Sequence, residues 1–258
     1  MLHRVIITAA SVIALAGAAN AADLGSYKGG PAYASVNWGG LYGGVNAGYG
    51  DGTAKTTIED SYYVNSTNWA NGSQSKSFDT SGGIGGGQIG YNVQNGRVVF
   101  GAEADLDASG ITGTNTNTLD LSPFGTSTAK GKSELNYVGT LRGRVGYTFG
   151  NALVYATGGL AFGDATDSLT WSGAAKGISK SSTLTGYVLG AGTEYALSPA
   201  WSVKAEYQYI DLGSTSLSQA GTSVNGHPVD AKFTDDHTYN TVRVGLNYHV
   251  GAGFDPLK

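Results

Sequence analysis

The chain has no cysteine, few charged residues and no long apolar run beyond its first residues, and each scarcity excludes a class of protein. Without cysteine there is neither a disulfide scaffold nor thiol chemistry. The net charge is -4 and no basic run occurs, which argues against a nucleic-acid partner. Beyond residue 21 no apolar segment approaches the ~20 residues that a transmembrane helix needs. If the exported chain meets a membrane, it must do so with strands.

The first 21 residues have the pattern of a secretory signal peptide. Arg4 supplies a positive charge, residues 5–17 form an apolar segment too short to span a bilayer, and residues 19–21 resemble a cleavage site. We therefore expect the signal peptide to cover residues 1–21. Residues 22–36 contain Gly, Pro and small side chains without periodicity, and we expect them to form a flexible periplasmic lead-in.

Much of the remaining chain alternates apolar and polar residues with a period of two. The clearest case is residues 135–149, where odd positions such as Leu135 and Tyr137 are apolar and even positions such as Arg142 and Arg144 are mostly polar. A period of two indicates a strand, and this one exceeds the ~5 to 6 residues usual in soluble proteins. Such a strand suits lipid on one face and a polar interior on the other.

The same alternation predicts eight strands, at residues 38–50, 83–93, 97–107, 135–149, 153–163, 183–197, 201–210 and 239–250. Tight turns are expected at Asn95-Gly96, Gly150-Asn151 and Ser198-Pro199. Between the other strands lie polar segments that we expect to be long loops, at residues 51–81, 108–132, 164–182 and 211–236.

Short turns that alternate with long loops are typical of transmembrane barrels, and an open strand edge in hydrocarbon leaves hydrogen bonds unmet. We therefore predict an all-β, eight-stranded antiparallel up-and-down transmembrane β-barrel over residues 37–250. Residues 251–258 form a short C-terminal tail in this scheme. The facing of residues 153–163 stays open, because both faces of that strand are rather apolar.

Outward aromatic residues of the predicted strands gather at the two strand ends. Those towards the short turns are Tyr91, Tyr147, Phe149, Tyr195, Trp201 and Tyr248. Those towards the long loops are Tyr49, Tyr137, Tyr187 and Tyr209. Because Tyr and Trp favour the two membrane–water interfaces, we expect these residues to contact outer-membrane lipid.

Charged residues on the polar faces are predicted to point into the barrel. They are Glu103, Asp105, Arg142, Arg144, Glu194, Lys204, Glu206 and Arg243. From their heights we expect Glu103 to lie level with Arg142 and Arg144, Glu194 to pair with Lys204, and Glu206 to lie near Arg243. Charges in a barrel interior are tolerated when paired or hydrated. An eight-stranded interior is only wide enough for its own side chains, so we predict a packed, polar, neutral network rather than an acid/base catalytic pair.

Two further motifs are weaker. Residues 85–90 match the G-x-G-x-x-G pattern of dinucleotide sites, but they run into a hairpin where that site requires a helix. Asp235, Asp236 and His237, with His227 nearby, have side chains that ligate metals or contact haem, yet polar residues of a solvated loop explain them as well. The strands show no Ser/His/Asp or Cys/His set, so we expect no enzyme activity, no cofactor and no metal site.

Four segments resemble one known family. They are Trp-Gly-Gly-Leu-Tyr-Gly-Gly at residues 38–44, Gly-Ala-Gly-Thr-Glu-Tyr at 190–195, Trp-Ser-Val-Lys-Ala-Glu-Tyr at 201–207 and Val-Arg-Val-Gly-Leu-Asn-Tyr at 242–248. All four are similar to the alphaproteobacterial outer-membrane immunogenic proteins, often labelled the porin family. The resemblance implies an OmpA-type barrel and a surface antigen in the outer membrane of a Gram-negative bacterium.

The last predicted strand also resembles the signal read by the barrel-assembly machinery, carried by Arg243, Gly245, Tyr248 and Val250. Members of the family usually end on an aromatic residue there, whereas this chain continues for eight residues, 251–258.

The resulting expectation is a structural, surface-exposed protein that contributes to envelope integrity, with both termini in the periplasm. Segments 51–81 and 211–236 are candidate contact sites for a host molecule or another extracellular ligand. Alternatives are a small-solute porin, a haemin- or ligand-binding surface protein, and an outer-membrane enzyme. Porins with an aqueous channel use ~16 to 18 strands, more than this chain can supply.

Overall fold

The computed structural model describes residues 36–65, 68–120, 126–171, 178–222 and 228–250. The predicted signal peptide at residues 1–21, the tail at 251–258 and the lead-in up to residue 35 lie outside these ranges. Among the described residues, no helix is long and apolar enough to cross a membrane.

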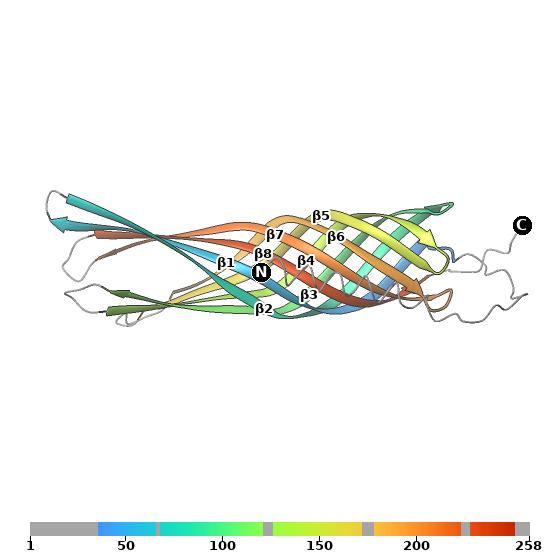
Figure 1. Ribbon diagram of the computed structural model, residues 1–258, viewed down its shortest axis with the longest axis horizontal. Coiled ribbons are helices and arrows are strands. Elements are labelled where there is room, and N and C mark those ends of the chain that lie inside the picture. Colours follow the sequence, from blue (N-terminus) through green and yellow to red (C-terminus); the bar gives the residue numbers. More distant parts are fainter. Residues whose placement is uncertain (1–35, 66–67, 121–125, 172–177, 223–227, 251–258) are drawn as a thin grey trace, which may run out of the picture.

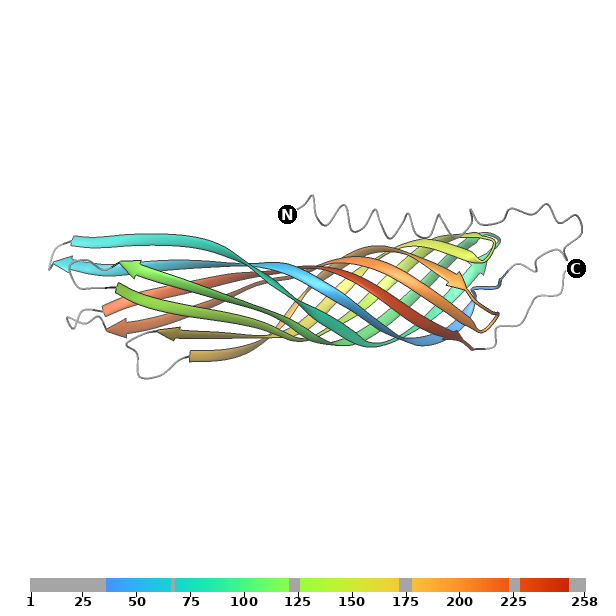
Figure 2. The same cartoon turned by 60° about the horizontal axis from the view of Figure 1, so that its bottom comes forward.

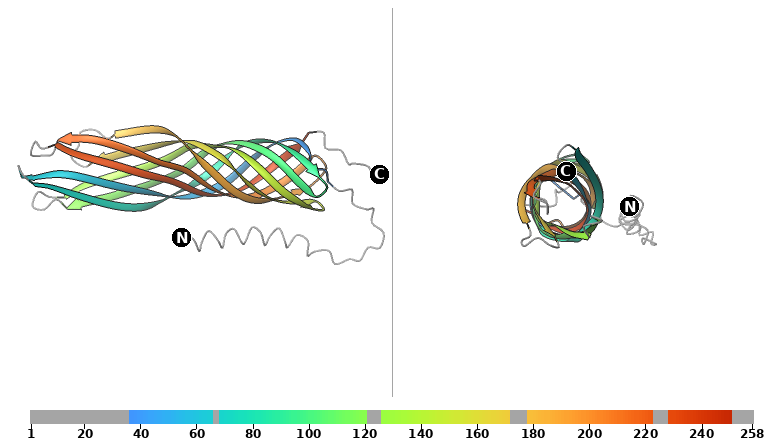
Figure 3. Two further views of the ribbon diagram at one scale, coloured as in Figure 1. Left: turned by 90° about the horizontal axis from the view of Figure 1, so that it is seen from above. Right: turned by 90° about the vertical axis from the view of Figure 1, so that its left-hand side faces the viewer.

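Eight antiparallel strands, each paired with the next along the chain, form one closed barrel (Figure 1; end-on view in Figure 3). They are β1 (Gly40–Asn65), β2 (Asn68–Asn95), β3 (Val98–Asp120), β4 (Thr126–Phe149), β5 (Ala152–Trp171), β6 (Ile178–Ala196), β7 (Trp201–Thr222) and β8 (Pro228–His249). The first and last strands close the ring, with Tyr42 opposite His249. The predicted eight-stranded up-and-down barrel is confirmed.

Alternation along each strand sets which side chains line the interior. In β1 the outward Leu41 and Val45 are exposed, whereas the inward Tyr42 and Asn46 are buried. The same alternation determines the facing of residues 153–163, which the sequence left open. In β5, Leu153, Tyr155 and Ala161 are buried inside the barrel, while Val154, Leu160 and Phe162 are exposed on the outside.

One predicted facing is wrong because β4 contains a bulge. Its pairing with β5 shifts register between Leu135, opposite Ala165, and Tyr137, opposite Asp164. A single inserted residue exchanges the two faces of a strand. Leu135 therefore points inward and is 3% exposed, although the simple alternation puts it on the lipid side. The bulged Asn136 points outward, and its Nδ2 donates to Asp164 Oδ1 at 2.8 Å.

The four predicted long loops are also wrong, because most of their residues extend the strands. In segment 51–81, β1 continues to Asn65 and β2 begins at Asn68. The strands likewise run through most of 108–132, 164–182 and 211–236 (Figure 2). Ser, Thr, Asn and Gly on a strand with water on its outer face give no apolar period, so the segments look like loops although their backbones are paired.

The ring does not stay closed along the full length of these extended strands. Pairing between β6 and β7 ends at Tyr187 and Asp211, and pairing between β2 and β3 ends at Ser81 and Thr112. Beyond these points the described strands form two four-stranded sheets, one ordered β2-β1-β8-β7 and the other β3-β4-β5-β6. The two groups separate towards the left of Figure 1.

The interior of the closed part is filled in three layers. Next to the short turns lies a small apolar cluster of Trp38, Val99, Leu153, Tyr155 and Ala196. The charged residues occupy the middle. Towards the strand extensions lies a larger apolar cluster of Ile84, Ile111, Leu135, Val138, Ala161, Ala165, Leu184, Val188, Ile210, Leu212 and Tyr239. The prediction of a wholly polar interior is therefore too simple, because apolar layers lie on both sides of the polar one.

Candidate functional site

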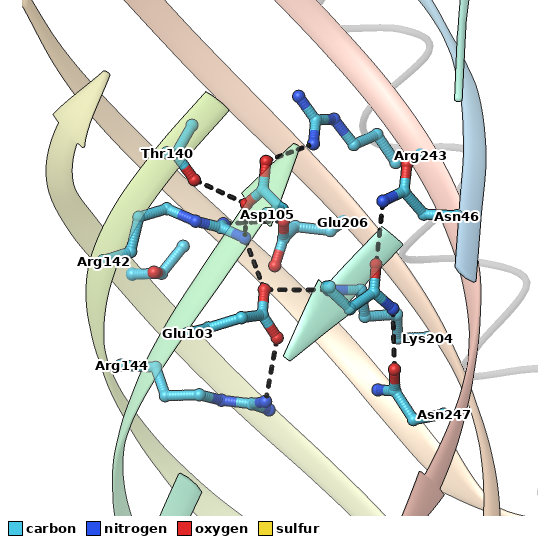
Figure 4. Close-up of polar contacts among 12 residues, drawn as sticks. Asn46, Glu103, Asp105, Thr140, Arg142, Arg144, Lys204, Glu206, Arg243 and Asn247 are labelled. Atoms are coloured by element: carbon cyan, nitrogen blue, oxygen red, sulfur yellow. Dashed lines mark hydrogen bonds and ion pairs between the residues drawn. The ribbon is translucent and has the colours of Figure 1, made fainter. Parts of the chain in front are cut away.

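The eight charged residues predicted to point inward all lie in the middle layer, and each is at most 5% exposed. Alternation brings them there from five strands: Glu103 and Asp105 from β3, Arg142 and Arg144 from β4, Glu194 from β6, Lys204 and Glu206 from β7, and Arg243 from β8. Asp107 on β3 is also fully buried and belongs to the same set. We call these nine residues the lumen network (most of it is drawn in Figure 4).

Arg142 is the centre of the lumen network. Its Nη2 contacts Glu103 Oε1 and lies 2.8 Å from Asp105 Oδ2, and its Nη1 lies 2.8 Å from Glu206 Oε1. Thr140 donates a further hydrogen bond to Asp105. One guanidinium therefore ties β3, β4 and β7 together across the barrel, with the planar fork geometry that suits carboxylates.

Arg144 links the middle layer to the layer nearer the short turns. Its Nη2 lies 2.9 Å from Glu194 Oε2, and its Nη1 lies 3.6 Å from Glu103 Oε2 and donates to the Tyr42 hydroxyl at 2.9 Å. The guanidinium also sits 4.0 Å from the centroid of the Tyr155 ring. A desolvated guanidinium over an aromatic face gains a cation–π contact in addition to its ion pairs.

The two remaining cations of the lumen network, Lys204 on β7 and Arg243 on β8, contact the carboxylates of β3. Lys204 Nζ lies 2.9 Å from Glu103 Oε1, and Arg243 Nη1 lies 3.1 Å from Asp105 Oδ1 and contacts Asp107. Glu103 thus receives contacts from Arg142, Arg144 and Lys204, and Figure 4 shows it between them.

The expected pairing of Glu194 with Lys204 is not the one that the structure shows, whereas Glu206 lies at the height of Arg243 as expected. Glu194 stands opposite Lys204 in the ladder of β6 and β7, and Glu206 stands opposite Arg243 in that of β7 and β8. Their ion-pair partners are nevertheless Arg144 for Glu194 and Arg142 for Glu206. Long arginine side chains reach across the narrow lumen, so height along the wall does not decide the partner.

The lumen network does not have the equal numbers of acidic and basic groups that we expected, because it holds five carboxylates and four cations. The fifth carboxylate, Asp107, is 0% exposed and contacts Arg243. Hydrogen bonds from neutral groups offset the excess negative charge. Ser202 Oγ and Asn247 Nδ2 donate to Glu194 Oε1 at 2.6 and 2.7 Å. Charge-assisted hydrogen bonds of this kind are among the strongest in proteins.

Two inward tyrosines belong to the site although the sequence did not single them out. The Tyr42 hydroxyl donates to Glu103 Oε2 at 2.7 Å, and the Tyr155 hydroxyl donates to Glu206 Oε2 at 2.7 Å. Each tyrosine stands opposite a glycine of the next strand, Gly90 and Gly192 respectively. A Cβ on Gly90 would lie 2.3 Å from the Tyr42 hydroxyl, so the ring needs that glycine. An inward tyrosine opposite an inward glycine is a signal that the sequence contains.

Ser202, His249 and Glu194 come close together, although the sequence suggested no such set. His249 Nε2 lies 2.9 Å from Ser202 Oγ, and the same hydroxyl is 2.6 Å from Glu194 Oε1. In a catalytic triad the carboxylate orients the histidine through its other nitrogen. Here the Glu194 carboxylate accepts a hydrogen bond from the Ser202 hydroxyl instead. The Trp38 ring packs edge-on against His249, with the ring centroids 5.6 Å apart. The arrangement is a buried hydrogen-bond chain.

Of the candidate metal or haem residues, only His237 has a side chain that the structure describes. His237 is buried, with its Nδ1 3.2 Å from the Tyr239 hydroxyl and its Nε2 3.8 Å from Asp167 Oδ2, so it is not part of a solvated loop. His227 and the side chains of Asp235 and Asp236 lie outside what the structure describes. Within the part of the chain that the structure describes, no group of three or more His, Asp or Glu side chains could hold a metal ion. The glycine-rich residues 85–90 lie inside β2, with no helix after them.

The outer surface carries the predicted interface aromatics. Tyr49, Tyr91, Tyr137, Tyr147, Phe149, Tyr187, Tyr195, Trp201 and Tyr248 are exposed, and Tyr209 is half-buried with its ring 6.2 Å from that of Tyr187. Of the predicted assembly signal, Arg243 is buried inside, Tyr248 points outward, and the Val250 N–H donates to Leu41 O at 2.8 Å just beyond β8. Gly245 points inward, where a Cβ would lie 3.0 Å from Lys204 Cγ.

Known proteins are similar to this chain along most of its length. The family described as "Outer membrane protein beta-barrel domain" matches residues 7–249. The 31 kDa outer-membrane immunogenic protein of Brucella melitensis is 38% identical, over 83% of this chain and 84% of that protein. The 22 kDa outer membrane protein of Rhizobium leguminosarum is 32% identical, over 62% of this chain and 64% of that protein.

Two solved structures align with most of this chain at low identity. The outer membrane protein OprG of Pseudomonas aeruginosa has a TM-score of 0.47 and 14% identity, and the match covers 82% of this chain and 97% of OprG. The outer membrane protease OmpT of Escherichia coli has a TM-score of 0.41 and 10% identity, over 80% of this chain and 96% of OmpT. With the family match over nearly the whole chain and the 38% identity to an outer-membrane immunogenic protein, this chain belongs to the outer membrane protein β-barrel family.

Proposed function

We propose that this protein is a structural component of the bacterial outer membrane that contributes to envelope integrity and holds two stiff sheets outside the membrane. The observation that carries the proposal is the filled interior of the barrel. Arg142 alone joins three carboxylates from β3 and β7, and apolar layers lie on both sides of it. Such an interior makes the barrel rigid, which suits a structural role.

The small-solute porin is the weaker alternative for the same reason. A conducting pore needs a continuous path lined by hydrated groups. In this barrel the lumen network is almost fully buried, and Ile111, Ile210 and Leu212 of the outer apolar cluster are each 1% exposed. Nothing about the described residues favours a haemin site, because His237 is buried against Tyr239.

In this proposal the short turns and both termini face the periplasm and the strand extensions face outward, as is usual for bacterial barrels. The partners are outer-membrane lipid around the exposed apolar face, and the barrel-assembly machinery during biogenesis. The described residues of the candidate ligand segments, 51–81 and 211–236, lie mostly in strands, so an external contact with them would be made by the sheet edges.

The test compares bacteria that lack the protein with bacteria that carry it. We expect the deletion strain to be more sensitive to a bile-salt detergent and to a large antibiotic that the outer membrane normally excludes. The wild-type gene should restore resistance. A matched variant with Arg142→Ala and Arg144→Ala, whose barrel is weakened, should restore it poorly. Unchanged sensitivity in the deletion strain, together with large stable channels of the purified protein in planar bilayers, would favour the porin.

A further inference from the structure

The wall of the barrel opens where β6 and β7 part. Their ladder ends at Tyr187 and Asp211. Above this point β6 stays paired with β5 up to Ile178, and β7 stays paired with β8 up to Thr222. Two strand edges that would face each other in a closed barrel are therefore left without their neighbour. We call this opening the β6/β7 seam, and the separated groups can be followed in Figures 1 and 2.

A backbone irregularity of β7 lies at the start of the seam. The pairing of β7 with β8 shifts register between Asp211 and Ser214, which marks a bulge. Gly213 in this bulge has φ of +76°, and its N–H donates to Asp211 Oδ1 at 2.9 Å. The residue before it, Leu212, is buried in the outer apolar cluster. Bulges bend a strand and increase its twist, so β7 is anchored at Leu212 and then turns away from β6.

The seam begins where the membrane is expected to end. Tyr187, in the last pair of the ladder, points outward and packs near Tyr209 at the long-strand end of the apolar face. An unpaired edge in hydrocarbon leaves backbone N–H and C=O groups without hydrogen bonds, which is strongly unfavourable, so the wall has to stay closed up to this level. Above it, water tolerates an open edge, and the backbone groups stay available to a partner.

The β7 edge lacks the usual devices that block strand addition. Residues 214–222 read Ser-Thr-Ser-Leu-Ser-Gln-Ala-Gly-Thr and contain neither a charge nor a proline. Their described pairing follows the β8 register without a further shift, from Ser214 opposite Asp236 to Thr222 opposite Pro228. Natural edge strands are commonly shortened, bulged or charged to prevent pairing with another chain. A long, regular, uncharged edge is suited to recognition of a strand.

We propose that the β6/β7 seam binds an extended, largely uncharged polypeptide segment of a partner protein by strand addition. The segment takes the place beside β7 that β6 vacates and pairs antiparallel with residues 214–222. Main-chain N–H and C=O groups along one edge match a polypeptide backbone, which offers both groups at the same spacing, and do not match a lipid or a metal ion. The proposal depends on the outward orientation in the proposed function, and its test is independent of envelope resistance.

The experiment is hydrogen exchange, read by mass spectrometry, on the folded full-length mature protein in detergent micelles. The probe is a synthetic peptide with the sequence of residues 178–186, the β6 extension itself. We expect the segment 214–222 to exchange rapidly in the free protein and several-fold more slowly with the peptide present. The control peptide carries an N-methyl group at every residue, which removes the N–H donors from both of its edges, and it should give no slowing.

Two variants of the bulge connect this result to the seam. Gly213→Asn keeps a residue that tolerates positive φ, whereas Gly213→Val introduces a β-branched residue that does not. We expect the Asn variant to keep the peptide-dependent slowing and the Val variant to lose it, since a straighter β7 stays beside β6. If the Val variant fails to fold, the exchange of residues 214–222 in the Asn variant and the comparison with the N-methylated peptide still test the proposal.

Three results overturn the proposal. The first is no slowing up to the solubility limit of the peptide. The second is equal slowing by the N-methylated peptide, which would show that backbone pairing is not involved. The third is a segment 214–222 already protected in the free protein together with a dimeric mass by light scattering, which would assign the edge to a second copy of this chain. None of these three results bears on the sensitivity of the deletion strain to bile-salt detergent and antibiotic, which tests the proposed function separately.

Discussion

Arg142 and Glu206 lie 64 positions apart in the sequence and on strands that are not neighbours, yet Arg142 Nη1 is 2.8 Å from Glu206 Oε1. The contact crosses the interior of the barrel, and both side chains are about 1% exposed. A pair that spans the lumen fixes the separation of β4 and β7 directly. The backbone ladders fix it only through the strands between them.

The first prediction concerns this pair. Arg142→Ala leaves Glu103, Asp105 and Glu206 without their shared partner, and removing one side of a buried ion pair typically costs about 3 to 5 kcal/mol. We expect a clearly lower urea midpoint for unfolding from lipid bilayers. Adding Glu206→Gln should recover part of the loss, because contacting residues couple.

The control for this cycle is the exposed pair of Lys132 and Glu134, whose Nζ and Oε1 atoms are 2.7 Å apart. Exposed ion pairs contribute ~0 to 1 kcal/mol, so its double-mutant cycle should show little coupling. Simple additivity for Arg142 and Glu206 as well would show that the two charges are separately hydrated. The lumen network would then not be a connected unit.

The second prediction tests the hydroxyls that bind buried carboxylates. Tyr42→Phe keeps the ring but removes the donor to Glu103, and Tyr155→Phe does the same for Glu206. Hydrogen bonds to charged groups contribute about 1.5 to 3 kcal/mol, so each variant should unfold at lower urea concentration. Tyr91→Phe, on the exposed outer face, is the control and should unfold like the wild type. Equal midpoints for all three variants would rule out a stabilising role for the inner hydroxyls.

The third prediction concerns the glycine that makes room for Tyr42. A Cβ at Gly90 would lie 2.3 Å from Cζ and from the hydroxyl of Tyr42. Gly90→Ala should therefore destabilise the barrel by about 1 to 3 kcal/mol, as overpacking usually does. The matched control is Gly87→Ala on the outward face of the same strand, where the nearest atom is Gly44 O at 3.5 Å. An unfolding midpoint for Gly90→Ala equal to that of Gly87→Ala would contradict the close packing.

The fold was predictable from the sequence to the extent that lipid imposes a period of two. Where one face is apolar and the other polar, as around Val45 and Asn46, the facing follows from alternation alone. Alternation fails at Leu135, because the bulge at Asn136 shifts the register and nothing in the local composition marks it. It fails again beyond Asp51, since water on the outer face removes the apolar signal while the backbone stays paired.

Eight charged members of the site were predictable, whereas Asp107, Tyr42 and Tyr155 were missed and the contacts could not be predicted. The inward positions on the strands identified Glu103, Arg142 and the other charged residues, because a charged side chain on the inward face of a barrel must point into the lumen. The partners depend on how far each side chain reaches across the lumen, which no strand register contains. Glu194 shows this clearly, since its ladder neighbour is Lys204 and its ion-pair partner is Arg144.

The fourth prediction tests the strand extensions. β1 and β2 pair in register from Thr53, opposite Asp79, up to Tyr63, opposite Trp69. Deleting residues 58–74, which begin and end at the ladder pair of Ile58 and Gln74, and joining the ends with a short turn shortens both strands while leaving the register of the rest unchanged. We expect the shortened protein to keep a boiling-dependent shift in detergent gels, because the membrane-level ladder is untouched. The contrasting variant deletes Thr53 alone, which offsets the register of β1 above that point and exchanges its two faces. It should assemble less efficiently, and equal assembly of both variants would contradict the extended ladder.

The fifth prediction is that the three interior layers block conduction in series. Trp38→Ala opens the layer next to the short turns, Arg144→Ala weakens the lumen network, and Ile111→Ala opens the outer apolar cluster. Because an ion must pass every layer, each single variant should stay near the wild-type baseline in planar bilayers, and only the triple variant should conduct. A boiling-dependent gel shift checks that the triple variant still folds. If one single variant conducts as well as the triple variant, that layer is the only barrier, and the other two layers already contain a continuous aqueous path.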